Sequence, residues 1–187
     1  MPRPPSNKRA RVLHAATQSI YARGFHKTSL ADIARSAGVP VGSVYYFFKA
    51  KSDLGRAVIE EHQARYREKC EQWDALPAPT QRLLAFLDMT IQNRDNLAAM
   101  GCPVGTLCSE LGKEDPTLGA DAAVVFAGLL DWLEAQFSAL GHSDTAREHA
   151  EHLLGAIEGA TLLTHSFRDP SYVEREAARL THYIQEL

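Results

Sequence analysis

The chain has 187 residues, enough for one compact domain or a small module joined to a larger body, and 45% of them are hydrophobic. No apolar run reaches the ~18 residues that a membrane span requires, and the basic first residues lack the apolar stretch of a signal peptide. Three cysteines without a secretion signal argue against a disulfide framework. We therefore expect a cytoplasmic protein.

The net charge of −3 conceals two segments of opposite charge. Residues 1–51 contain nine Lys or Arg and a single acid, Asp32, which gives this segment a charge of +8. The other residues contain 11 basic and 22 acidic side chains, which gives them a charge of −11. A cationic segment on an anionic body is typical of proteins that bind a polyanion such as nucleic acid.

Helical periodicity dominates the sequence, without sustained period-2 alternation, so the predicted fold class is all-α. Residues 1–6 form a Pro-rich arm, and Ser6 or Asn7 is expected to cap a first helix. Gly24 is a typical residue at the end of such a helix. The first predicted element is therefore a helix from about residue 7 to residue 23.

Two short helices follow the first. Ser29 and Asp32 have the spacing of a capping box for one of them, which Gly38 ends. Pro40 suits the first turn of the next, at roughly residues 40–47. Two short helices joined by a turn that contains glycine form a helix-turn-helix, whose second helix enters the DNA major groove.

Longer helices are expected in the rest of the chain, separated by prolines, glycines and an irregular piece at residues 101–105. Their expected ranges are about 50–73, 80–94, 106–112, 117–140, 144–167 and 171–186. We expect residues 1–50 to form a helix-turn-helix DNA-binding domain and residues 51–187 to form a helical domain for effector binding and dimerisation.

The front of the third predicted helix carries the side chains that we expect to face DNA. Gly42 and Ser43 are small, so the backbone can approach the nucleic acid closely. Ser43, Tyr45 and Tyr46 have hydroxyls that can reach bases or phosphates. The alternative is that the aromatic run is core. We expect a division in which Phe48 and part of Tyr45 pack against the first helix, while Tyr46 and Phe47 are more exposed.

Two helix N-termini add candidate phosphate contacts. Lys49 and Lys51 stand at the start of the fourth predicted helix, where a cation is unfavourable unless an anion such as a phosphate lies outside. Thr28 and Ser29 precede the second helix, whose N-terminal N–H groups can also bind phosphate.

Residues 24–54, GFHKTSLADIARSAGVPVGSVYYFFKAKSDL, resemble the DNA-binding segment of the tetracycline-repressor (TetR) family of transcriptional regulators. The resemblance implies an all-helical homodimer of about nine helices that binds double-stranded DNA at a palindromic operator and is released by a small molecule. It also implies that the last two helices pair across a two-fold axis. It assigns base or phosphate contact to Thr28, Gly42, Ser43, Tyr45, Tyr46 and Lys51.

Gly155 and Gly159 lie four residues apart within the helix predicted at 144–167. A glycine inside a helix costs ~1 kcal/mol relative to alanine, so a pair on one face needs a reason. Together with Ala156 and Ala160, the glycines permit a close helix contact. That contact is either the dimer interface or a crossing within the chain.

Residues 101–111, GCPVGTLCSEL, are similar to a stretch in a TetR subgroup that responds to electrophiles and to acrylate. Near a helix N-terminus a thiol can be acidified, which makes Cys102 a candidate sensor. The alternative is a small buried hydrophobic residue that lines a pocket. We expect this effector pocket among the fourth to eighth helices; its candidate lining residues, each of which also fits an ordinary core, are Cys102, Phe86, Met89, Met100, Phe126, Trp132 and His165.

Two other classes of function are compatible with parts of the sequence: an enzyme, and a module that binds a membrane surface or an acidic protein. An enzyme could use His149 and His152 as a metal pair beside Glu148 and Glu151, but a third ligand at matching spacing is missing from the sequence, as is a nucleotide-binding glycine loop. A membrane surface or an acidic protein could attract the cationic segment, but the glycine-containing turn favours DNA. We expect a regulator without cofactor, metal or enzymatic activity.

Overall fold

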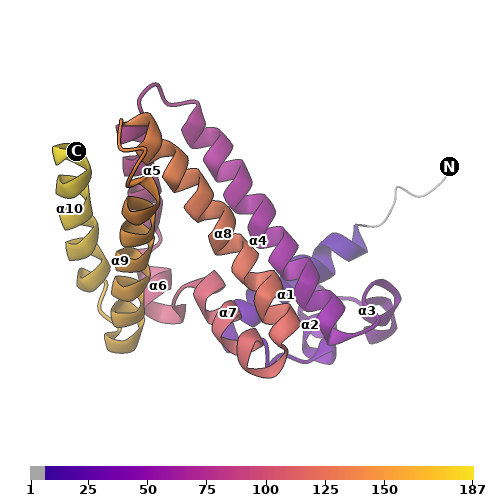
Figure 1. Cartoon of the computed structure of the whole chain (residues 1–187). Coiled ribbons are helices and arrows are strands. Elements are labelled where there is room, and N and C mark those ends of the chain that lie inside the picture. Colours follow the sequence, from indigo (N-terminus) through magenta and orange to yellow (C-terminus); the bar gives the residue numbers. More distant parts are fainter. Residues whose placement is uncertain (1–6) are drawn as a thin grey trace. The chain divides into compact units, whose positions relative to one another are not determined.

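The structure, a computed structural model, describes residues 7–187 apart from the side chain at position 114. The Pro-rich arm predicted at residues 1–6, with the alternative cap Ser6, lies outside them. The described residues form helices and no strand (Figure 1), which confirms the all-α prediction. The helices are α1 (Lys8–Arg23), α2 (Leu30–Ala37), α3 (Val41–Phe47), α4 (Lys51–Asp74), α5 (Pro79–Gln92), α6 (Arg94–Met100), α7 (Pro103–Glu114), α8 (Pro116–Ala139), α9 (Ala146–Phe167) and α10 (Ser171–Glu186).

Nine of these helices correspond to the nine expected from the sequence, and α6 is an additional short one. It begins where Asn93 interrupts α5, without the proline or glycine that usually marks a break. No helix in the described part of the chain is both long and apolar enough to cross a membrane.

The chain divides into two compact units, which we describe separately. The first contains the residues up to His62 together with Thr106–Ala123, and the second contains Gln63–Gly105 and Val124–Leu187. The boundary predicted at residue 50 falls within the first unit, which also includes the beginning of α4.

The first unit is built on α1, α2 and α3, which pack on one another. The side chain of Ser29 accepts a hydrogen bond from the Asp32 N–H, and the Asp32 carboxylate accepts one from the Ser29 N–H, so the expected capping box is present. Gly38 ends α2 at φ 62°, a left-handed conformation that favours glycine. These local signals fix the turn that separates α2 from α3.

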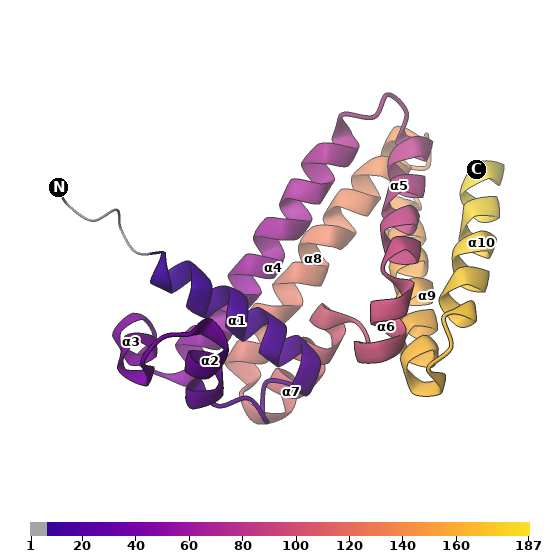
Figure 2. The same ribbon diagram turned by 180° about the vertical axis from the view of Figure 1, so that it is seen from behind.

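The second unit has a core to which α5, α8, α9 and α10 contribute. Helix α10 packs on both α9 and α5, and α9 and α10 lie next to each other in both views (Figures 1 and 2). In α10 the buried residues Val173, Ala177, Leu180 and Ile184 recur at spacings of three and four, which places them on one face of the helix. They join a core that includes the fully buried Phe137. The opposite side of α10 is polar, as expected for an amphipathic surface helix.

Candidate nucleic-acid interface and ligand pocket

Helix α3 lies in the cationic segment, residues 1–51, and several of its side chains are exposed. Tyr46 is 74% exposed and Tyr45 is 51% exposed, whereas Val44 and Phe48 are buried. Gly42 is exposed, and a methyl group at its Cα would meet nothing within 4 Å. The expected division of the aromatic run is present for Phe48, which is core, and for Tyr46. Tyr45 is more exposed than expected, and Phe47 is half-buried.

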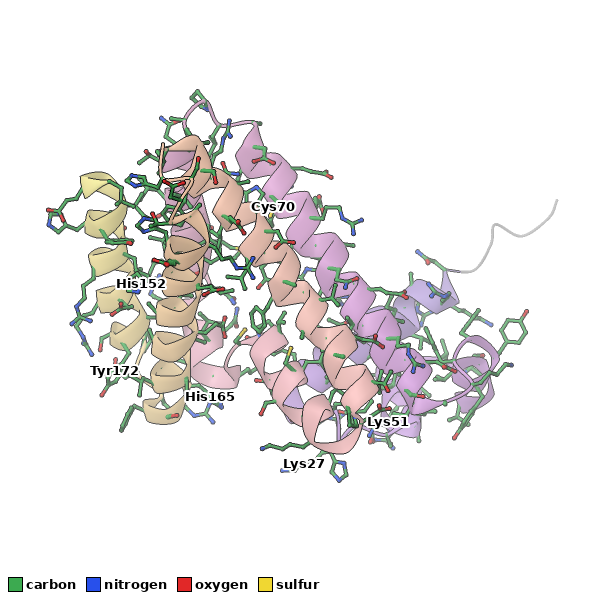
Figure 3. All side chains as sticks on the ribbon, viewed as in Figure 1. Lys27, Lys51, Cys70, His152, His165 and Tyr172 are labelled. Carbon is green, nitrogen blue, oxygen red and sulfur yellow. The ribbon has the colours of Figure 1, made fainter. Side chains whose placement is uncertain are left out.

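Lys49 and Lys51 were both predicted to contact phosphate, but their surroundings in the structure differ. The Lys49 ammonium lies 5.8 Å from the centre of the exposed Tyr46 ring. The Lys51 ammonium instead donates to the His26 carbonyl at 2.9 Å and lies 4.7 Å from the centre of the Phe25 ring. Lys51, labelled with Lys27 in Figure 3, is therefore already bound within the first unit.

The start of α4 carries its own acid, which the sequence argument for Lys51 did not include. The Asp53 carboxylate accepts a hydrogen bond from the Ala50 N–H at 3.1 Å, so it caps the helix as an anion at an N-terminus does. The Asp53 carboxylate thus offsets the unfavourable interaction of the Lys51 charge with the N-terminus of α4. The position of Lys51 is therefore not by itself evidence for an external phosphate.

Thr28 corrects a prediction. Its side chain is fully buried, and its hydroxyl hydrogen-bonds to the carbonyls of Gly24 at 2.7 Å and Ser19 at 3.2 Å. A hydroxyl used in this way is not available to a phosphate. Thr28 therefore holds the end of α1 to the segment before α2, whereas the exposed Ser29 stands at the N-terminus of α2.

A carboxylate from α7 also holds this segment. Glu110 accepts a hydrogen bond from the His26 N–H at 3.2 Å. A methyl group at Gly24 would lie 2.3 Å from Glu110 Oε1, and Gly24 has a φ of 85°, so the position requires glycine. The loop between α1 and α2 is consequently fixed from two sides, by Lys51 and by Glu110.

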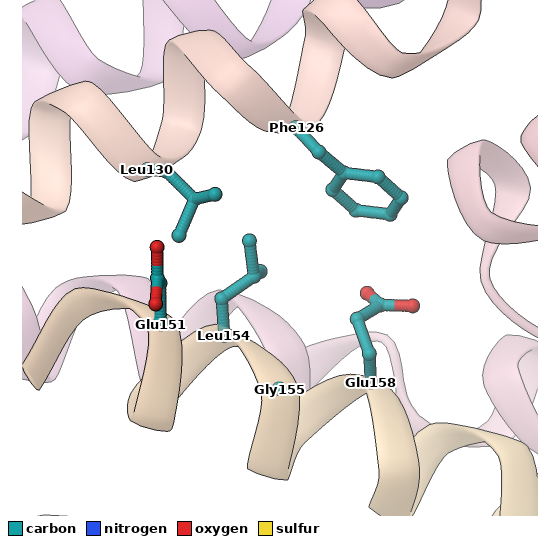
Figure 4. A pocket seen from close by; sticks show the side chains of 6 residues that line it. All are labelled: Phe126, Leu130, Glu151, Leu154, Gly155 and Glu158. Carbon is teal, nitrogen blue, oxygen red and sulfur yellow. The ribbon is translucent and has the colours of Figure 1, made fainter. Parts of the chain in front are cut away.

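In the second unit, residues of α8 and α9 line a pocket that is open to solvent and has a cavity volume of about 270 Å³ (Figure 4). Its lining is Phe126 and Leu130 from α8 and Glu151, Leu154, Gly155 and Glu158 from α9. The side chains of Phe126, Leu130 and Leu154 are apolar. Glu158 is half-buried. This cavity lies between two of the helices among which the effector pocket was predicted.

The seven residues predicted to line an effector pocket are not brought together. Phe126 lines the pocket, and Cys102 contacts its wall through Glu158. Phe86 is 2% exposed and packs edge-on against Trp73 at 6.0 Å, so it is core. Trp132 donates from its indole to Asp74 at 3.0 Å.

The other three predicted lining residues also lie outside the pocket. Met89 packs against the core of the second unit. His165, labelled near the end of α9 in Figure 3, faces the Ala98 carbonyl at 3.3 Å. Met100 is the last residue of α6 and is half-buried. Five of the seven predicted residues therefore lie outside the pocket. The pocket residues that were not predicted to line it are Leu130, Glu151, Leu154, Gly155 and Glu158.

The surroundings of Cys102 oppose the predicted acidification. The Gly105 N–H donates to Cys102 Sγ at 3.2 Å, as expected near the start of α7. Burial nevertheless raises the pKa of the Cys102 thiol, and the neighbouring Glu158 carboxylate raises it further. The thiol is therefore poorly ionised at neutral pH, which favours the alternative of a small buried residue over a nucleophile.

His149 and His152 have structural contacts in place of the considered metal role. His149 hydrogen-bonds to the hydroxyls of Tyr183 and Thr145, and His152 lies edge-on to the Tyr183 ring at 5.1 Å. Among the described residues, no group of three or more His, Cys, Asp or Glu is arranged to hold a metal ion.

The exposed residues of α9 are mostly charged or polar near the start of the helix and mostly apolar near its end. Gly155 and Gly159 are exposed, and a methyl group at either would meet nothing within 4 Å. The crossing within the chain that was considered for these glycines is therefore absent from the described residues. Large apolar side chains lie toward the end of the helix: Leu162 (65% exposed), Leu163 (44%) and Phe167 (63%).

Comparison with known families gives two matches that together cover most of the chain. Residues 12–58 match the model described as bacterial regulatory proteins of the tetR family. Residues 79–179 match the model described as the C-terminal domain of LmrA/YxaF-like transcriptional regulators. The second match covers more than half of the 187 residues.

Individual relatives agree with the family matches. The HTH-type transcriptional regulator LmrA of Bacillus subtilis is 27% identical over 162 residues, which cover 84% of this chain and 86% of LmrA. The transcriptional regulator AcuR of Cereibacter sphaeroides is 29% identical over 122 residues, 64% of this chain and 54% of AcuR. In fold, the chain is similar to the crystal structure of a TetR transcriptional regulator from Legionella pneumophila, with a TM-score of 0.86, 22% identity and 98% coverage of both chains.

Proposed function

Since the chain belongs to the TetR family of bacterial regulatory proteins, we propose that it binds a palindromic DNA operator as a homodimer and releases it when a small molecule occupies the second unit. It is a DNA-binding transcriptional regulator and, like its family, not an enzyme. The observation that carries the proposal is the exposed tyrosine pair on α3 of a strongly cationic segment.

We assign the DNA contacts from exposure. Gly42, Ser43, Tyr45 and Tyr46 lie at the front or on the open side of α3, where base edges and phosphates would meet them. Lys49 adds a cation for a phosphate, and Ser29 offers the N-terminus of α2. Thr28 and Lys51 act through the loop that they hold, because their polar groups are bound inside the unit.

Selection of binding sites from a random DNA pool with the full chain tests this function. We expect one palindrome, bound at least ~1,000-fold more tightly than random DNA, with an affinity that falls steeply with salt. Salt-dependent binding without preference for any sequence would contradict the proposal and favour the membrane-surface or acidic-protein alternative.

The dimer is proposed to form through α9 and α10, with Gly159 at a close helix contact and Leu162 at its apolar margin. Exposed apolar side chains of this kind are typical of an interface between copies of a chain. Replacing Gly159 with glutamate would place a charge in that contact, so sedimentation velocity should show a shift from dimer to monomer. The matched variant Ala64→Glu, on the exposed side of α4, should remain dimeric. A dimeric Gly159→Glu variant would argue against this interface.

We propose that the effector binds without a covalent bond to Cys102. Its thiol is less ionised than that of Cys70, whose pKa is raised by burial to about 11. Because the thiolate is the reactive form, iodoacetamide should label Cys102 at least several-fold more slowly than Cys70, as followed by mass spectrometry. Faster labelling of Cys102 would restore the electrophile sensor suggested by its sequence neighbourhood.

A further inference from the structure

Glu158 introduces a carboxylate into a pocket that is otherwise largely apolar. Figure 4 shows its side chain rising from α9 toward the Phe126 ring, which projects from α8 into the same space. Leu130 and Leu154 form the neighbouring wall. The pocket thus combines an aromatic face, two aliphatic side chains and one charge.

The contacts of Glu158 within the chain do not include a cation. The Cys102 thiol, a weak donor, hydrogen-bonds to the carboxylate, and Gly105 lies so close that a methyl group there would come within 3.1 Å of Glu158 Oε2. Among the described residues, no Lys, Arg or His forms an ion pair with Glu158. A carboxylate that is partly removed from water without a counter-charge is destabilising, so its position needs a reason.

Glu151, at the edge of the same pocket, shows the contrast. Its carboxylate is exposed and accepts a hydrogen bond from Arg147 at 2.9 Å. Two acids on one face of α9 are therefore treated differently, since one is neutralised by the chain itself and the other is not. Burial raises the pKa of Glu158, in agreement with the missing counter-charge.

We propose that this pocket binds a small organic cation, an ammonium or amidinium group carried on an apolar body, with the Glu158 carboxylate as its counter-ion. The inference rests on the proposed function, because it names the chemical class of the effector. An anionic ligand would be repelled by the carboxylate, and a neutral apolar ligand would cover it without compensating its charge.

The other walls suit the same ligand. Phe126 offers an aromatic face to a cation, an interaction that strengthens when water is excluded. The cavity volume of about 270 Å³ lies just below the ~300–1,000 Å³ of typical ligand pockets, so the cation is small. Leu130 and Leu154 would cover its apolar body.

The test compares a cation with its uncharged isostere. Benzyltrimethylammonium and neopentylbenzene have nearly the same shape and differ by one charge. Calorimetric titration of the full chain at neutral pH should show binding of the cation about tenfold or more tighter than binding of the isostere. Equal affinities, tighter binding of the isostere, or no binding of the cation would overturn the proposal.

Two variants locate the discrimination. In Glu158→Gln, the ratio of the two affinities should fall to about one, because the amide has the same shape without the charge. In the matched variant Glu148→Gln, which changes an exposed acid of α9 outside the pocket lining, the ratio should persist. A persistent ratio in Glu158→Gln would place the counter-ion elsewhere and overturn the assignment. If Glu158→Gln fails to fold, the comparison of the two ligands on the unmodified chain still decides.

The readout is independent of DNA, which keeps the two proposals separable. Failure to select an operator would remove the proposed regulation by operator release while leaving the calorimetric result intact. Operator binding together with equal affinities for the two ligands would leave the regulator in place and remove the cation as its effector.

Discussion

Each of the two units has side chains in unusual surroundings: the first exposes aromatic rings, and the second partly buries a carboxylate. In the first unit, the aromatic rings of Tyr45 and Tyr46 are exposed, although aromatic surface is normally buried. In the second unit, the Glu158 carboxylate is half-buried in a pocket without a cationic partner among the described residues, although carboxylates are normally exposed or paired. Exposed rings with hydroxyl groups suit a broad polar partner that lies over them, whereas a recessed charge suits a small partner that enters. The contrast agrees with the two proposals, a surface for DNA in one unit and a pocket for a small molecule in the other.

The largest expected effect separates two aromatic residues of the first unit. Phe48 is 3% exposed, so Phe48→Ala should lower the free energy of unfolding by about 3–5 kcal/mol. Tyr46→Ala should change it by no more than ~0.5 kcal/mol, because the ring is mostly in solvent. Urea unfolding followed by circular dichroism measures both. Similar losses in the two variants would mean that Tyr46 is also core.

DNA binding should show the reverse order of importance for Tyr46. Tyr46→Ala is expected to weaken operator binding by about 1–3 kcal/mol, roughly tenfold to a hundredfold, as measured by fluorescence anisotropy. The conservative variant Tyr46→Phe separates the ring from its hydroxyl. Unchanged affinity in the alanine variant would remove Tyr46 from the interface.

Stability against pH tests the recessed charge of the second unit. The raised pKa of Glu158 means that the folded chain binds its proton more tightly than the unfolded chain does. Stability is therefore lost as the pH rises from the unfolded pKa of a glutamate through the folded pKa of Glu158.

Glu158→Gln removes this loss, so the variant should be more stable than the unmodified chain at neutral pH. We expect the gain to be smaller than the effect of Phe48→Ala. The gain should shrink toward zero as the pH falls below the unfolded pKa of a glutamate, because Glu158 is then neutral in both states. Thermal unfolding of both proteins across this pH range measures the difference. A variant that is less stable at neutral pH would show that the carboxylate is stabilised by the chain itself.

The smallest effect concerns a single phosphate contact. Lys49→Gln should weaken operator binding several-fold and reduce the slope of log affinity against log salt by ~0.9, the value for one neutralised phosphate. Lys69→Gln, on the exposed surface of α4 in the second unit, serves as the control and should leave the slope unchanged. An unaltered slope for Lys49→Gln would show that Lys49 does not contact a phosphate of the DNA.

Local signals carried most of the fold. The capping box of Ser29 and Asp32 and the left-handed Gly38 are short-range chemistry, and the structure has both where the sequence predicted them. Helix α6 was missed because Asn93 interrupts the helix without a strong breaker on either side. Local rules thus account for the helix-turn-helix better than for the junctions of the second unit.

Site residues whose surroundings come from distant segments were harder to predict. Thr28 has the sequence position of a phosphate contact, but its hydroxyl hydrogen-bonds to the carbonyls of Ser19 and Gly24. Glu158 lies more than fifty residues from Cys102, so no sequence window joins them. A signal was nevertheless present, since Glu158 lies three residues after Gly155, on the helix face where this small residue leaves space.

The division of the chain within helices has a practical consequence. The chain passes from one unit to the other inside α4, inside α7 and inside α8, and never in a loop. A protease therefore finds no exposed linker to cut, and no single truncation can release either unit complete. A fragment that ends at residue 50 would lack Glu110 and the buried Leu107 and Leu111, which belong to the same unit as the helix-turn-helix. The unit that contains the helix-turn-helix is thus assembled from two distant stretches of sequence, and a gene fragment that encodes only the first stretch would not encode the whole unit.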